Sequence, residues 1–272
     1  MTALLQTDQL TCQFGGLLAV GGVDLTLKAG DVHGLIGPNG AGKTTFINLI
    51  SGHIRQTSGK IFFDGSDISA MAPDKRATVG IRRTFQNLRL FREITAIENV
   101  KVGLHANTQS EVFHSLLRTR RQRQEEREIA DRAREALDFV GLLGSADVVA
   151  GSLPYGHQRL LEIARAFVGK PRLILADEPA AGLNGAEAGR LVGVIRRIQE
   201  AGVSVMLVEH HMQVVMRACD RITVLNYGKK LADGSPADIR DHSGVIEAYL
   251  GTKPVYTRSE RHTTPEARHA AP

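Results

Sequence analysis

The sequence lacks tryptophan, and aromatic residues make up only 5% of its 272 positions. Its two cysteines, Cys12 and Cys219, lie far apart without the paired spacing of zinc ligands. This excludes a disulfide framework and fits a reducing compartment. No apolar run approaches the ~18 residues that span a bilayer, and the first ten residues show no leader pattern. We therefore expect a soluble or peripheral protein in the cytoplasm.

Charge of one sign is not in large excess. Lys and Arg number 34 against 29 Asp and Glu, which gives a net charge of +5. Residues 118–134 hold seven Arg against four acids, and residues 252–272 hold four basic residues against two acids. A solvated helical face explains such a stretch better than a nucleic-acid site does, so we expect no nucleic-acid partner. Residues 251–272 are rich in Thr, Pro, Ala and His and predict a disordered tail.

Short apolar runs of strand length alternate with helical stretches, and hydrophobic residues make up 42% of the chain. This pattern predicts an α/β core with a parallel sheet. From about residue 95 to 165 the pattern is helical throughout, which predicts a helical subdomain inserted into that core. The expected strands are 32–36, 61–63, 172–176 and 203–208, and the expected helices are 43–51 and a long polar one at 118–140 that buries Ile129, Ala133, Ala136, Leu137 and Val140.

Residues 37–44, GPNGAGKT, match the phosphate-loop pattern G-x-x-x-x-G-K-[ST] between a predicted strand and a predicted helix. Glycines let successive N–H groups face one concavity, and the helix adds its positive N-terminal end. Lys43 supplies a charge for the β and γ phosphates, and the Thr44 hydroxyl can bind Mg²⁺. The loop predicts a nucleoside triphosphate but does not separate kinases, GTPases, helicases and transport ATPases.

A second cluster begins where the strand LILAD ends, at Asp177 and Glu178. Asp177 fits the Mg²⁺-holding acid of phosphate-loop enzymes. Glu178 is expected to point the opposite way and to activate a water as a general base. His210 ends the next apolar run and could hold water and phosphate together. A metal site at His210 and His211 is not expected, because adjacent residues of an extended chain face opposite ways.

Two further sequence motifs do not indicate a function on their own. Gln86 could reach Mg²⁺ or the attacking water, although an ordinary surface glutamine is the simpler interpretation. Residues 153–159, LPYGHQR, open an amphipathic helix whose N-terminus is a second anion site, or simply a helix start. Within a single chain this second anion site has no obvious ligand, since the phosphate loop already binds the nucleotide.

These motifs, in this order along the chain, resemble those of the nucleotide-binding subunits of ABC transporters. GPNGAGKTT is similar to Walker A, LPYGHQ to the signature, LILADE to Walker B, and AGLN at 181–184 to the D-loop. RTFQNLRLFREITAIENV, EPAAGLN and VIEAYLG further resemble the LivG-type ATPases of branched-chain amino acid importers. The resemblance covers residues 4–250. It implies an ABC ATPase fold with N-terminal antiparallel strands, a core at 1–86 and 166–250, and a helical signature subdomain at 87–165.

The resemblance implies Mg-dependent ATP hydrolysis that powers import. Partners would be two permeases, a second ATPase subunit that is the same or a related chain, and a periplasmic or extracellular solute-binding protein. The chain would sit on the cytoplasmic face of the membrane. Implied catalytic residues are Glu178, His210 and Gln86, and implied metal ligands are Thr44, Asp177 and Gln86. Implied ATP contacts are Phe14, Val20, Gly37, Asn39, Gly40, Ala41, Gly42, Lys43, Thr44 and Thr45, with Leu153, Tyr155, Gly156 and His157 binding the ATP held by the partner subunit.

Some positions depart from the family pattern. Pro154 and Tyr155 replace the usual Ser and Gly of the signature, so the serine hydroxyl is absent while backbone N–H groups remain. His157, Asn184 and His211 also differ, which leaves the fine control of hydrolysis open. The solute contacts lie on other chains, so an importer of urea or short amides remains an alternative. So does a soluble ABC ATPase that acts on nucleic acid or ribosomes.

Overall fold

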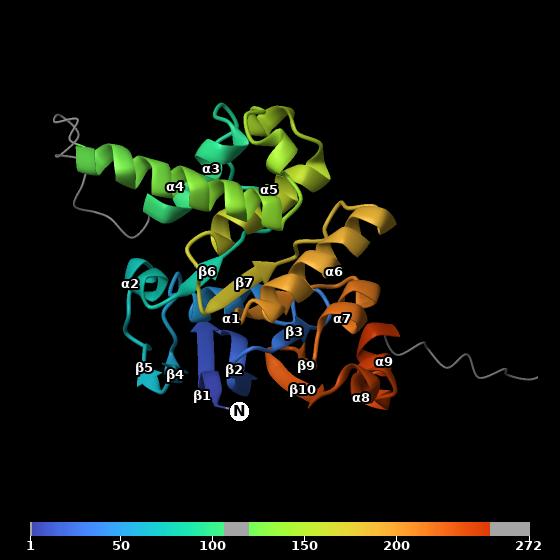
Figure 1. Ribbon diagram of the computed structural model, residues 1–272. Helices are drawn as coiled ribbons and strands as arrows, with labels where there is room; N and C mark the ends of the chain where they lie inside the picture. Colours follow the sequence, from blue (N-terminus) through green and yellow to red (C-terminus); the bar gives the residue numbers. More distant parts are fainter. Residues whose placement is uncertain (1, 106–119, 251–272) are drawn as a thin grey trace, which may run out of the picture.

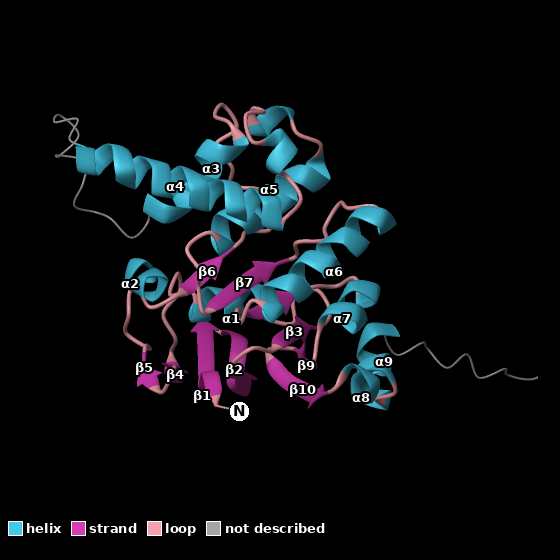
Figure 2. Cartoon of the chain, viewed as in Figure 1, coloured by secondary structure: helices cyan, strands magenta, loops and turns pink. Residues whose placement is uncertain are grey.

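The computed structural model of the chain describes residues 2–105 and 120–250. Two sheets form the lower part of the molecule in Figure 1, and a layer of helices covers its upper end. Figure 2 shows that strands gather in the lower part and that the upper layer is helical. Among the described residues, no helix combines the length and apolarity needed to cross a membrane.

The first sheet is antiparallel, with strand order β2-β1-β4-β5. Its long hairpin joins β1 (Ala3–Phe14) to β2 (Leu17–Lys28) through a turn at Gly15, where φ is +57°. β4 (Ser58–Phe63) pairs with the other edge of β1, and β5 (Ser66–Asp67) pairs with β4. The N-terminal antiparallel strands implied by the resemblance are therefore present.

The second sheet has strand order β10-β9-β3-β8-β7-β6. Its parallel strands are β6 (Ile81–Arg83), β7 (Leu173–Asp177), β8 (Ser204–Val208), β3 (Val32–Ile36) and β9 (Arg221–Asn226), and β10 (Lys229–Gly234) runs antiparallel to β9. Every residue of β3, β7 and β8 is buried. Continuous apolar runs are what a parallel sheet covered on both faces requires.

Side-chain alternation assigns the two faces of this sheet. Leu173 and Leu175 of β7 join a core with α1 (Lys43–Ile50) and the antiparallel sheet. Ile174 and Ala176 join the other core, which includes α6 (Gly185–Glu200) and α7 (Met212–Ala218). The shorter helices are α2 (Pro73–Thr78), α8 (Pro236–Arg240) and α9 (Ser243–Leu250).

The helical layer contains α3 (Ala96–His105), α4 (Arg120–Phe139) and α5 (Tyr155–Phe167), with short 3-10 turns at Leu143–Ser145 and Ala150–Ser152. Gly103 lets α3 approach α5 closely, because a Cβ at this position would lie 2.3 Å from the Arg165 carbonyl oxygen. The long helix α4 buries Ala133, Ala136 and Leu137, and Val140 directly after it is also buried; its charged residues from Glu125 onward are exposed. Its predicted apolar face is confirmed.

The predicted α/β core with an inserted helical segment is confirmed, and the predicted strands agree with β3, β4, β7 and β8 to within a few residues. β6, β9 and β10 were not predicted, because β6 has three residues and the hairpin β9–β10 carries polar positions. The helical layer ends at Phe167, two residues past the expected border at 165. The predicted tail at 251–272 and the start of the polar helix at 118–119 lie outside the described residues.

Candidate functional site

A cleft of about 720 Å³ opens at the carboxyl ends of β3 and β7, where ligands of such sheets bind. It brings together the phosphate-loop residues, one acid and one glutamine that the sequence singles out. Its lining consists of Phe14, Leu17, Leu18, Ala19, Asn39, Gly40, Ala41, Gly42, Lys43, Thr44, Thr45, Gln86, Glu178 and Tyr227.

The phosphate loop depends on glycine at two points of close approach. Gly37 and Gly42 have φ of +152° and +100°. A Cβ on Gly37 would lie 2.1 Å from the Leu225 carbonyl oxygen, and one on Gly42 would lie 2.3 Å from that of Ala19. Gly42 begins α1 without any side-chain cap. The first N–H groups of a helix have no partner inside it, so they are available to a ligand in the cleft.

Lys43 is buried at the base of this loop. Its Nζ donates to the carbonyl oxygens of Gly37 at 2.7 Å and Pro38 at 2.9 Å. Burial lowers the pKa of this ammonium, and the nearby charges of Glu178 and Asp177 oppose that effect. Two of the three N–H groups thus hold the loop in shape, which leaves one for an anion.

Asp177 ends β7 and forms a buried ion pair with Arg83. The Arg83 Nη2 lies 2.9 Å from the Asp177 Oδ2, and Arg83 Nη1 also donates to Asn48 Oδ1 at 2.6 Å and Ser51 Oγ at 3.1 Å. Burial raises the pKa of Asp177, while Arg83 works against the rise. The sequence interpretation did not single out Arg83. The only available signal was its position three residues before Gln86.

Glu178 adopts a backbone conformation that is uncommon outside glycine, with φ of +47°. Its Oε2 accepts a hydrogen bond from Gln86 Nε2 at 3.0 Å and lies 3.6 Å from His210 Nδ1. The structure therefore brings Gln86, Glu178 and His210 together, as the sequence predicts. Asp177 and Glu178 have separate partners, although Glu178 lies beyond the end of β7, where strand alternation no longer applies.

The loop that carries Gln86 is fixed to helix α5. Arg159 donates to the carbonyl oxygens of Phe85 at 3.1 Å and Gln86 at 2.7 Å. Glu162 accepts from the backbone N–H of Phe85 at 3.2 Å, and burial raises the pKa of this carboxyl. Gln86 is thus held by the helical layer, whereas Glu178 belongs to the sheet.

The four predicted signature residues lie at the start of α5 and do not line the cleft. Tyr155 is exposed and its hydroxyl accepts from Arg159, while Leu153 and Gly156 are buried. A Cβ on Gly156 would lie 2.6 Å from Glu187 Oε1, so glycine allows α5 and α6 to approach. His157 also lies in this first turn. The structure thus separates these four residues from the phosphate loop of their own chain.

The apolar wall of the cleft differs from the prediction at one position. Phe14 lines it and is 49% exposed, whereas Val20 is fully buried in the core beneath the antiparallel sheet. The structure gives no support to the predicted ring contact at Val20, because a register shift in the β1–β2 pairing interrupts the alternation of β2 and turns this side chain inward. Leu17, Leu18 and Tyr227 line the wall instead. Tyr227 belongs to the tight β9–β10 turn, whose Gly228 N–H donates to the Ala41 carbonyl oxygen at 3.0 Å.

His210 and His211 do not face opposite ways as expected. Their ring centroids lie 4.3 Å apart with 35° between the planes, because the chain leaves the extended conformation after β8. Together with Glu209 they place three possible metal-ligand atoms within 4.8 Å of one another. The Glu209 carboxylate, however, is fully buried and already accepts several N–H groups. The directions of the two rings therefore do not exclude a metal site, contrary to the prediction, although the buried carboxylate offers little access.

The donors of the cleft fit a magnesium nucleotide. N–H groups at the start of α1 and the Lys43 ammonium suit phosphate oxygens. Thr44 is exposed in the cleft and contributes a hydroxyl. Asp177 is buried and does not line the cleft, but it directly precedes Glu178 and has a carboxylate oxygen besides the one that Arg83 binds. Hard oxygen donors of this kind are what Mg²⁺ prefers. The apolar wall with Phe14 and Tyr227 offers a surface for a planar base.

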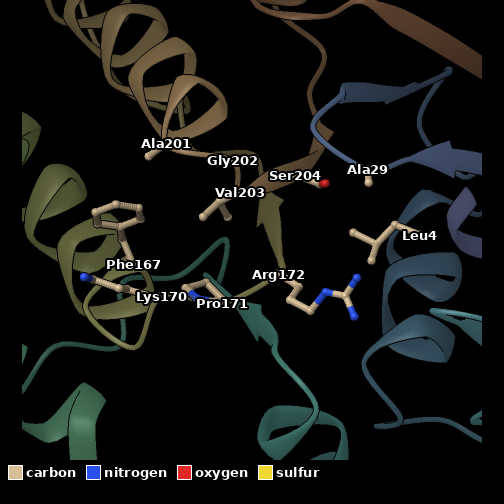
Figure 3. Close-up of a pocket in the computed structure, with 10 residues that line it drawn as sticks. All are labelled: Leu4, Ala29, Phe167, Lys170, Pro171, Arg172, Ala201, Gly202, Val203 and Ser204. Carbon is tan, nitrogen blue, oxygen red and sulfur yellow. The ribbon is translucent and has the colours of Figure 1, made fainter. Parts of the chain in front are cut away.

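A second cavity, of about 460 Å³, lies at the opposite ends of the parallel strands, beside the residues that precede β7 and β8 (Figure 3). Arg172, which reaches across it in Figure 3, is paired with Asp64. None of the predicted site residues lines this cavity.

Comparison with known proteins shows two family matches. The family described as "ABC transporter" matches residues 20–181, and the family described as "Branched-chain amino acid ATP-binding cassette transporter" matches residues 229–254. The chain is 46% identical over 249 residues to the high-affinity branched-chain amino acid transport ATP-binding protein BraF of Pseudomonas aeruginosa, covering 91% of this chain and 98% of that protein. It is 43% identical to LivG of Escherichia coli, which carries the same description, with the same coverage.

Solved structures show the same fold. The ADP conformation of an ATP-binding cassette of an ABC transporter matches with a TM-score of 0.82 and 30% identity, covering 92% of this chain and all of that one. A nucleotide-free ATP-binding cassette from an ABC transporter matches with a TM-score of 0.81 and 31% identity, at the same coverage.

Proposed function

We propose that this protein binds Mg-ATP in the cleft and hydrolyses it to power import of branched-chain amino acids. The chain belongs to the ABC transporter family of ATP-binding subunits. One observation supports this most directly. The phosphate loop and Lys43 stand across the cleft from Glu178, whose carboxylate lies within reach of both Gln86 and His210. A phosphate site and a candidate base therefore share one space.

Different residues of the chain would bind the phosphates, activate the water, hold Mg²⁺ and hold the base. Lys43 and the N–H groups at the start of α1 would bind the β and γ phosphates. Glu178 would accept the proton of the attacking water, while Gln86 and His210 would orient that water and the γ phosphate. Thr44, Asp177 and Gln86 would hold Mg²⁺, which neutralises developing phosphate charge when bound. Phe14 and the other residues of the apolar wall would hold the base.

A second ATPase subunit would complete the site. The signature residues Leu153, Tyr155, Gly156 and His157 lie outside the cleft of their own chain and begin a helix whose N-terminus suits an anion. Placed against the cleft of another subunit, they would contact its ATP from the opposite side. We further propose two permeases and a solute-binding protein as partners, with this chain at the cytoplasmic face of the membrane.

Replacement of Glu178 tests the hydrolytic role. Glu178→Gln keeps the size of the side chain and removes the base, so we expect ATP binding to persist and turnover to fall by about 100-fold or more. Glu200→Gln, which changes an exposed glutamate at the end of α6, is the control. Full activity in E178Q would refute the role of Glu178. A wild-type chain that neither binds nor hydrolyses ATP would refute the function itself.

The cargo needs a separate experiment. The match to the branched-chain family at residues 229–254 and the relatives' names support branched-chain amino acids. Uptake of labelled leucine, isoleucine and valine should fall in cells that lack the gene and should return with the wild-type chain, but not with E178Q. Loss of urea or amide uptake with unchanged leucine uptake would contradict this cargo. Co-purification with two membrane proteins and a second ATPase would support the partners.

A further inference from the structure

Glu209 is a fully buried carboxylate between β8 and α7. Its Oε1 accepts the backbone N–H of Ala180 at 2.7 Å. Its Oε2 accepts the backbone N–H groups of His210 at 3.1 Å and His211 at 3.3 Å, and lies 3.3 Å from His211 Nδ1. All of these backbone partners are donors. An ionised carboxylate, which only accepts, is the side chain that fits them.

The two oxygens of Glu209 join two different loops. Ala180 lies in the loop that follows β7 and begins with Glu178, whereas His210 and His211 lie in the loop that follows β8. The same two loops are also connected by the Glu178 N–H, which donates to the Val208 carbonyl oxygen at 2.9 Å. The carboxylate thus provides the second connection, two residues beyond Glu178 on one side and directly next to His210 on the other.

The loop after β7 needs such support. Glu178 has a φ of +47°, a conformation that costs a non-glycine residue free energy and persists only when its surroundings enforce it. The following turn is closed by the Ala181 N–H, which donates to the Glu178 carbonyl oxygen at 3.1 Å. Glu209 binds the N–H of Ala180 inside this turn. It therefore restrains the backbone at the point where the Glu178 side chain is aimed at His210.

We propose that Glu209 is a positioning residue for ATP hydrolysis: it fixes the loop of Glu178 and the loop of His210 to one carboxylate, and so sets the geometry between these two side chains. The inference rests on the proposed hydrolytic function. Glu209 is buried and does not line the cleft, so it acts through Glu178 and His210 and not on the nucleotide.

Glu209→Gln is the first test, made in the full-length chain. The amide keeps one oxygen, but its NH₂ group must face backbone N–H donors on one of the two loops. Misplacement of a catalytic group by about 1 Å can cost on the order of 100-fold. We expect kcat to fall at least tenfold, with KM for ATP and the affinity for ATP unchanged. Glu98→Gln is the control, because Glu98 also accepts a backbone N–H, from Thr95, but lies away from both loops.

A double-mutant cycle separates positioning from a general loss of structure. If Glu209 sets the geometry between Glu178 and His210, then E209Q should lower kcat by a smaller factor in the His210→Ala background than in the wild type, because part of that geometry is already lost. Multiplied losses in the double variant would overturn the proposal, as would full activity in E209Q. An inactive wild-type chain would instead refute the proposed function, so the two failures are distinguishable.

Hydrogen exchange in the wild-type chain provides a test that does not depend on a variant that folds. The amides of Ala180, His210 and His211 lie in loops, yet each donates to Glu209. We expect these three amides to exchange at least tenfold more slowly than the amide of Glu93, in the exposed turn before α3. Exchange as fast as at Glu93 would contradict the proposal, even if E209Q failed to fold.

Discussion

Arg83 holds the Asp177 carboxylate against the end of helix α1. The pair is almost completely buried, with side-chain exposures of 10% and 4% and a separation of 2.9 Å between Nη2 and Oδ2. Because Arg83 also binds Asn48 and Ser51, it joins β6 and the end of β7 to the C-terminal end of α1, which is the end away from the phosphate loop. Arg83, which is not among the residues predicted to bind ATP or Mg²⁺, thus fixes Asp177, which is predicted to bind Mg²⁺.

Replacement of Arg83 by methionine should destabilise the fold, because it leaves Asp177 buried without its partner. Loss of one member of a buried ion pair typically costs about 3–5 kcal/mol, and we expect a loss of this order in urea unfolding. Arg172→Met is the matched control, since it breaks an exposed pair with Asp64. Equal stability losses in the two variants would contradict this view of Arg83.

Gly42→Ala should abolish ATP binding. The added Cβ would lie 2.3 Å from the Ala19 carbonyl oxygen and would require a non-glycine residue at φ of +100°. Gly202→Ala, at φ of +83° with no atom within 4 Å of its Cβ, carries conformational strain without a clash. We expect G202A to lose about 1 kcal/mol of stability while it keeps its affinity for ATP. Normal ATP affinity in G42A, measured by calorimetry, would exclude the predicted clash.

Phe14→Ala should weaken ATP binding, because Phe14 lines the apolar wall and is half exposed. Stacking of a base on an aromatic ring contributes about 1–3 kcal/mol, so the Kd should rise by about tenfold. Val20→Ala is the informative comparison. It removes a fully buried side chain and should lower stability by about 1–3 kcal/mol, with no change in Kd once folded. A larger affinity loss in V20A than in F14A would restore the original expectation for Val20.

Acidification should destabilise the protein through His33. Burial lowers the pKa of this histidine from 6.5 to about 4, so the native state keeps it neutral while the unfolded chain takes up a proton. Its Nε2 lies 2.8 Å from Thr223 Oγ1, and Nδ1 has no hydrogen-bond partner. The stabilisation is present above pH 6.5 and is lost as the pH falls from 6.5 towards 4. The loss of stability relative to neutral pH amounts to about 2 kcal/mol at pH 5.

Urea unfolding at pH 7.5 and pH 5 measures this effect. His33→Gln removes the titrating group, so its free energy of unfolding should fall less between the two pH values than that of the wild type. His242→Gln, which changes an exposed histidine before α9, should retain the full wild-type pH dependence. The same pH dependence in H33Q as in the wild type would exclude His33 as the cause.

Much of the fold could be predicted because apolar runs such as residues 32–36 and 204–208 are buried on both faces of a parallel sheet, and such runs stand out in a sequence. The phosphate loop was predictable for a related reason, since its glycines meet backbone atoms that exclude any side chain. Arg83, Leu17 and Tyr227 could not be found this way. Their positions depend on pairing between distant segments, and a local sequence pattern does not indicate which strand end lies next to which loop.

Val20 and the two histidines show the limit of local rules. Simple alternation from the buried Val23 would turn Val20 outward, but a register shift in the β1–β2 pairing turns it into the core, and the sequence does not show where such a shift occurs. His210 and His211 would diverge on a strand, yet the chain turns after Val208 and places their rings side by side. In both cases tertiary structure decides the direction in which a correctly identified segment presents its side chains.

The attachment of the Gln86 carbonyl to Arg159 has a practical consequence. Gln86 keeps its place relative to α5, whereas Glu178 keeps its place relative to β7, so a tilt of the helical layer changes the separation between these two positions. Spin labels on an exposed residue of α5 and one of α6 would convert that tilt into a distance distribution. Gln86 Nε2 and Glu178 Oε2 lie 3.0 Å apart in this structure, so the label distance measured without nucleotide is the reference against which any tilt on nucleotide binding is read.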